Sequence, residues 1–139
     1  MLVVLDTNVL LSAMIAPTGQ PAQIHEAWRQ KRFELATCTD QIEEIRRASR
    51  YPRFRAALQP HLFGILINNL SRAQVWTRAL PAHHVSADPT DSFLLNLSEA
   101  VRAHYLVTGD KRARILELGK VGDTKILTPR QFCGEVLHL

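Results

Sequence analysis

Short apolar runs recur along the chain and predict the strands of one sheet. The run LVVL at residues 2–5 has no polar position, which is typical of a strand buried on both faces of a parallel sheet. Similar runs lie at 33–37, 105–108 and 125–127. Residues 75–77 are either a further strand or an extended crossing at the sheet edge. The runs therefore predict four to five strands.

Between these runs, apolar residues recur at helical spacing, and capping residues mark where helices begin. Asp88 before Pro89 is a typical helix start, and Asp40 with Glu43 has the spacing of a capping box. The predicted helices are 21–31, 40–49, 60–73, one starting at 89 and one starting at 129. Strands that alternate with helices predict a three-layer α/β fold, with a central, mostly parallel sheet flanked by helices. We expect residues 1–139 to form one such domain.

Composition fits an ordinary globular domain and adds a preference for a polyanionic partner. The chain has 139 residues, 46% hydrophobic and 22% charged, and its 17 Lys and Arg against 13 Asp and Glu give a net charge of +4. These values exclude long disorder, collagen-like sequence and a disulfide scaffold. A basic surface favours nucleic acid as a partner.

The start of the chain and its two cysteines predict a cytoplasmic protein. Residues 1–16 lack a basic beginning, and Asp6 and Asn8 interrupt the apolar run, so we do not expect this segment to act as a signal peptide. No apolar run reaches the roughly 20 residues of a membrane span. Cys38 and Cys133 are too few for a disulfide framework and are expected to be buried thiols.

Acidic residues fall where the predicted strands end. Asp6 directly follows the first strand, and Asp110 follows the strand 105–108 after one glycine. Further acids lie in the first turns of two predicted helices: either Glu43 or Glu44, and either Asp88 or Asp91. Each of these acids also has a plain structural explanation as a turn, cap or surface residue. Because parallel sheets bind ligands outside the carboxyl ends of their strands, four carboxylates can converge on one pocket.

Carboxylates that converge in this way require a cation. Two unit charges 4 Å apart repel by roughly 4 kcal/mol at an effective dielectric constant near 20. Oxygen ligands select a hard ion, Mg²⁺ or Mn²⁺, and the six histidines show no spacing typical of a zinc site. Such an ion on a basic protein indicates phosphodiester chemistry.

Four segments together resemble the PIN-domain nucleases, in particular the VapC-like toxins of type II toxin–antitoxin pairs. They are LDTNVL from residue 5, IEEI from 42, DPTDSFLL from 88 and LVTGD from 106. The resemblance covers essentially the whole chain and implies a Rossmann-like PIN fold and an Mg²⁺- or Mn²⁺-dependent endoribonuclease. It implies that the catalytic, metal-binding acids are Asp6, Glu44, Asp91 and Asp110.

The resemblance also assigns supporting positions. Thr7, Asn8 and Thr108 match polar positions that support the first acid and the metal-bound waters. Two positions depart from the family pattern, since Thr90 stands where many relatives have another acid, and Ser98 where they often have alanine. Neither departure removes one of the four acids.

A basic segment is the expected contact with partners. It is either a solvated helix face or a surface that binds RNA or an acidic antitoxin segment, and it contains Arg46, Arg47, Arg50, Arg53 and Arg55. We expect an RNA substrate, a cognate antitoxin and a homodimer. The alternatives are a non-catalytic RNA- or partner-binding PIN-like module and an RNA-processing nuclease without an antitoxin. A nucleotide-binding Rossmann domain is disfavoured because the chain lacks GxGxxG.

Overall fold

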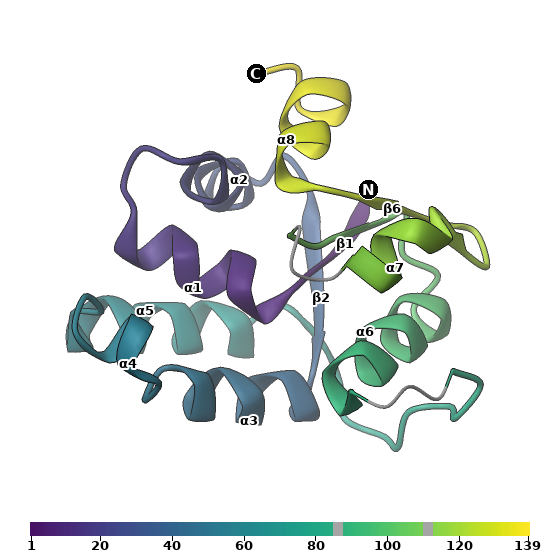
Figure 1. Ribbon diagram of the computed structural model, residues 1–139, viewed down its shortest axis with the longest axis horizontal. Helices are drawn as coiled ribbons and strands as arrows, with labels where there is room; N and C mark the ends of the chain where they lie inside the picture. The colour runs from purple at the N-terminus through teal and green to yellow at the C-terminus, as the bar shows by residue number, and fades with distance from the viewer. Residues whose placement is uncertain (85–87, 110–112) are drawn as a thin grey trace.

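A single sheet forms the centre of the molecule. The computed structural model describes residues 1–84, 88–109 and 113–139 (Figure 1). The strands are β1 (Leu2–Leu5), β2 (Glu34–Cys38), β3 (Gln74–Trp76), β4 (Tyr105–Val107), β5 (Lys120–Val121) and β6 (Thr124–Leu127). In the described residues they lie in the order β3-β2-β1-β4-β6-β5, and every neighbouring pair is parallel except β5 and β6. The mostly parallel α/β fold is therefore confirmed.

Helices follow most of the strands. They are α1 (Thr7–Ile15), α2 (Gln20–Arg29), α3 (Thr39–Ala48), α4 (Pro52–Arg55), α5 (Pro60–Ser71), α6 (Pro89–Ala100), α7 (Ala113–Leu118) and α8 (Pro129–Gln131), with a π-helical turn at Phe132–Val136. The five predicted helices are present, each beginning within one residue of its expected start. The pattern did not predict α1, α4 or α7.

The sixth strand differs from the expectation of four to five. Lys120 and Val121 pair with β6 through a two-residue turn, in which Gly122 adopts a φ of +55°. Glycine tolerates this left-handed conformation without a steric penalty. A strand of two residues is too short to leave a periodic signal in the sequence.

The central strands are buried on both faces, as the unbroken apolar run predicted. Leu5 packs with α1, α2 and α5 residues on one face, whereas Val4 packs with α6 residues on the other. Figure 1 shows α1, α2 and α5 on one side of the sheet and α6 and α7 on the opposite side. Successive residues of β1 thus point to opposite faces of the sheet and belong to two separate apolar cores.

The start of α3 differs from the predicted capping box. Cys38 is the N-cap residue and provides no side-chain cap, so Asp40 lies inside the first turn and Glu43 is exposed. The helix follows β2 without a loop, which leaves no place for a capping residue at Asp40. Instead, the buried Gln41 amide anchors this turn, because it accepts a hydrogen bond from the Thr37 hydroxyl and donates one to the Leu5 carbonyl.

Cys38 and Cys133 are buried free thiols, as predicted. Burial raises the pKa of Cys38 to about 11 and also raises the pKa of Cys133. Among the described residues, no helix is both long and apolar enough to cross a bilayer.

Candidate metal-dependent nuclease site

Asp6 is fixed at the junction of β1, β4 and α1. Its backbone N–H donates to the Val107 carbonyl (2.9 Å), and its side chain caps α1 by accepting from the Asn8 backbone N–H (3.2 Å). The buried Thr108 hydroxyl donates to the second carboxylate oxygen at 2.7 Å. Asp6 itself is 1% exposed. The structure therefore places the Thr108 side chain against the first acid, whereas Asn8 contacts it only through its backbone N–H.

Thr7 is the third supporting position. It is 1% exposed, and its hydroxyl oxygen is buried without a hydrogen-bond partner among the described residues. A buried hydroxyl without a partner costs roughly 1–3 kcal/mol. Thr7 directly follows Asp6, at the edge of the sheet where β1 ends.

Asp91 lies in the first turn of α6, the helix that packs against β1. It is 7% exposed, although aspartate is rarely buried to this extent in proteins. Figure 1 shows that α1, α3 and α6 all begin at the same edge of the sheet, where β1 and β2 end. Asp6, at the end of β1, and Asp91, in the first turn of α6, therefore both lie at this edge.

Glu44, on α3, lines the same cavity as the beginning of α6. A cavity of about 190 Å³ separates α3 from α6, and its lining residues are Asp40, Glu43, Glu44, Arg47, Pro89 and Phe93. Glu43 and Glu44 both reach this cavity, but only Glu44 is partly buried. The structure thus brings Glu44 close to the turn that carries Asp91.

The fourth predicted acid, Asp110, lies outside the described residues. Within 1–84, 88–109 and 113–139, no three His, Cys, Asp or Glu side chains are grouped closely enough to hold a metal ion. Asp6, Glu44 and Asp91 therefore do not form a complete site by themselves. The four-acid site stays a prediction in which Asp110 supplies an essential ligand.

The five predicted contact arginines are all exposed on α3, α4 and the connection between them. In the described part of the chain none of them forms an ion pair, and one of them, Arg47, lines the cavity beside Glu44. Another, Arg53, lies 5.0 Å above the ring of the buried Phe54. The structure leaves these charges accessible to an anionic partner.

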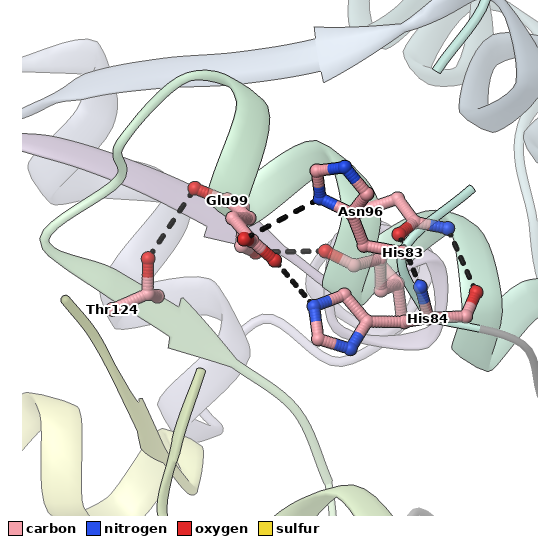
Figure 2. Close-up of polar contacts among 7 residues, drawn as sticks. His83, His84, Asn96, Glu99 and Thr124 are labelled. Atoms are coloured by element: carbon pink, nitrogen blue, oxygen red, sulfur yellow. Dashed lines mark hydrogen bonds and ion pairs between the residues drawn. The ribbon is translucent and has the colours of Figure 1, made fainter. Parts of the chain in front are cut away.

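Polar contacts between α6 and the segment before it form a clamp that the sequence did not reveal (Figure 2). Asn96 accepts from the His84 backbone N–H and donates to the His84 carbonyl, both at 2.9 Å. The His84 ring binds one Glu99 carboxylate oxygen, and His83 lies 3.5 Å from the other. The hydrogen bond from His84 is the main reason that the pKa of Glu99 is lowered.

We predict that Asn96→Ala lowers the free energy of unfolding by about 1–3 kcal/mol, because it leaves the His84 backbone groups without their partners. Urea denaturation measures this change. The exposed Asn68 on α5 provides the matched control, since Asn68→Ala removes the same group from a helix surface. Equal stability of the two variants would show that the clamp contributes nothing.

Comparisons with known proteins agree with this architecture. The PIN domain family matches residues 2–112, so the chain belongs to the PIN domain family. Members of this family are generally nucleases that use divalent metal ions. The chain is also similar to an uncharacterized protein of Methanocaldococcus jannaschii, with 27% identity over 96% of this chain and 90% of the relative. No solved structure matched the chain.

Proposed function

We propose that this protein is an Mg²⁺- or Mn²⁺-dependent endoribonuclease that hydrolyses RNA phosphodiester bonds. The observation that carries the proposal is the buried Asp6 carboxylate, which Thr108 and the Asn8 N–H orient at the end of a central strand in a PIN domain. Asp91, nearly as buried, lies on the helix that packs against the same strand. Two carboxylates at one edge of the sheet would supply oxygen donors of the kind that a hard divalent cation prefers.

The chemistry of the site fits a hard divalent ion. Asp6, Asp91, Asp110 and Glu44 would hold it, and all their donor atoms are carboxylate oxygens, which suit Mg²⁺ and Mn²⁺ rather than zinc. The Thr7 hydroxyl, which has no partner among the described residues, would be satisfied by a water of the ion's hydration shell. Such an ion, when bound, activates a water and stabilises the leaving oxygen.

Other residues of the chain would orient the metal-binding carboxylate and attract the RNA backbone. Two hydrogen bonds fix both Asp6 oxygens, so the carboxylate needs little reorganisation when it binds a ligand. The five exposed arginines of α3 and α4 offset the repulsion between an acidic pocket and the RNA backbone. Arg47 lines the same cavity as Glu44, so one of these charges would lie beside a proposed metal ligand.

We further propose that the nuclease is the toxin of a toxin–antitoxin pair and forms a homodimer. The same arginines offer an acidic antitoxin segment a binding surface, so antitoxin and RNA would compete for it. Co-expression with the product of a small neighbouring reading frame tests this part, because a cognate antitoxin should suppress cleavage. A neighbourhood without such a gene favours an RNA-processing role.

We predict that the purified protein cleaves a mixed RNA substrate in millimolar Mg²⁺, that excess EDTA abolishes cleavage and that added Mn²⁺ restores it. The reason is that the acidic donors alone cannot generate a nucleophile at neutral pH. Gel analysis of end-labelled RNA measures the rate. Cleavage that persists in EDTA, or that is equal in a parallel preparation of Asp91→Asn, would reveal a contaminating activity and contradict the proposal.

A further inference from the structure

The ends of four adjacent strands form a row that includes Asp6. In the sheet register, Val4 is opposite Ala36 and Leu5 is opposite Val107. Asp6 lies two residues after Val4, so it is level with Cys38, which lies two residues after Ala36. It lies one residue after Leu5, so it is also level with Thr108, which follows Val107. Cys38 is in turn opposite Trp76, the last residue of β3. Trp76 thus lies two strand spacings from Asp6, about 10 Å between backbones.

Trp76 also lies on the same face of the sheet as Asp6. Its side chain packs against the core that contains Val4, Cys38 and Phe93. Asp6 comes two residues after Val4 in extended backbone, so the period of two places both on that face. Phe93 of this core also lines the acidic cavity between α3 and α6. The indole is therefore a neighbour of the candidate nuclease site, at the edge of the sheet.

Arg78 covers this indole. Its guanidinium carbon lies 4.3 Å from the centroid of the Trp76 ring. Arg78 is exposed and forms no ion pair with any residue that the structure describes. The indole N–H points back to the Ala79 carbonyl at 3.5 Å, which helps to hold the turn around Arg78 in place. The result is a planar cation whose partner is an aromatic ring rather than a carboxylate.

We propose that Arg78, supported by Trp76, is a nucleobase-binding subsite for single-stranded RNA. This inference rests on the proposed nuclease function and specifies where a base beside the cleaved bond would bind. Unpaired RNA bases are commonly stacked on aromatic rings or on arginine planes, and the guanidinium edge can bind a phosphate at the same time. A surface cation–π pair contributes only about 0.5–1 kcal/mol to folding, so folding stability alone gives little reason for it.

The test measures RNA binding in the Asp6→Asn background, in which the substrate stays intact. Fluorescence anisotropy follows a labelled single-stranded RNA of about 12 nucleotides, a length within the usual range of single-strand binding sites. We expect Arg78→Ala to weaken binding by about 5- to 100-fold, as for the loss of one stacked base. Arg78→Lys, which keeps the charge but not the planar face, should recover less than half of this loss on a logarithmic scale.

Two controls separate stacking from charge. Arg72→Ala removes another exposed charge, beyond the opposite end of β3, and should weaken binding less than twofold. An abasic oligonucleotide of the same length should bind almost equally to the Asp6→Asn protein with and without the Arg78→Ala change. Full recovery by Arg78→Lys, equal losses at Arg78 and Arg72, or equal losses on abasic and normal RNA would each overturn the proposal. Wild-type cleavage is a separate measurement, so a nuclease without this subsite remains recognisable.

Discussion

Replacement of Asp6 by Asn is expected to lower kcat for RNA cleavage by about three orders of magnitude. A metal ion contributes several kcal/mol of transition-state stabilisation, and each 1.36 kcal/mol corresponds to a factor of about ten in rate. Both Asp6 carboxylate oxygens accept hydrogen bonds that orient them at the end of β1, so a neighbouring side chain cannot readily take over its role. Single-turnover cleavage of end-labelled RNA measures the loss.

The Asp6→Asn variant is expected to stay folded. Asparagine is as good an N-cap as aspartate, so its carbonyl oxygen can still accept from the Asn8 N–H. Its amide can face the Thr108 hydroxyl, which then acts as the acceptor. The loss is therefore one of charge rather than of shape, and circular dichroism should show an unchanged α/β spectrum.

Thermal unfolding gives a second readout for the same substitution. Millimolar Mn²⁺ should raise the Tm of the wild type, since a ligand that binds only the folded state stabilises it, and this rise should be lost in Asp6→Asn. Asp123→Asn, in the exposed β5–β6 turn, is the matched control and should keep both the rise and the activity. An Asp6→Asn protein with wild-type cleavage and a wild-type response to Mn²⁺ would remove Asp6 from the site.

The sequence was most informative about strands that are buried on both faces of the sheet. A strand covered on both faces has no polar positions, so β1 could be predicted from LVVL alone. The same logic located Asp6, because a carboxylate directly after such a strand must lie at the ligand-binding edge of a parallel sheet. By contrast, α1 was missed because apolar residues fill it with little helical periodicity, and β5 was missed because two residues carry no pattern.

The side-chain hydrogen bonds that connect distant elements could not be predicted from the sequence pattern. Gln41 occupies the first turn of α3, where an amide ordinarily faces solvent, and its partner Leu5 is 36 residues away. The clamp of His84 by Asn96 depends in the same way on how α6 packs, which no local spacing encodes. Hydrogen bonds of this kind depend on tertiary contacts, so they become visible only when the elements are assembled.

Gln41→Ala is expected to lower the free energy of unfolding by about 2–4 kcal/mol, because it leaves two buried groups without partners. Gln41 is 1% exposed; it donates to the Leu5 carbonyl at 2.6 Å and accepts from the Thr37 hydroxyl at 2.5 Å. The Leu5 carbonyl lies where the registered pairing between β1 and β2 has ended, and Thr37 is fully buried. Chemical denaturation measures the change, and Gln23→Ala on the exposed face of α2 is the matched control.

A double-mutant cycle separates this network from simple loss of volume. Thr37→Val removes the donor to Gln41, and Gln41→Met keeps the length of the side chain but none of its hydrogen bonds. If the contacts act as a unit, the double variant should be more stable than the sum of the two single changes implies, by about 0.5–3 kcal/mol. Strict additivity, or a Gln41→Ala change no larger than that of Gln23→Ala, would contradict the prediction. Because Leu5 immediately precedes Asp6, a loosened Gln41 contact should also weaken the Mn²⁺-induced rise in Tm, whereas a purely local packing defect would leave it unchanged.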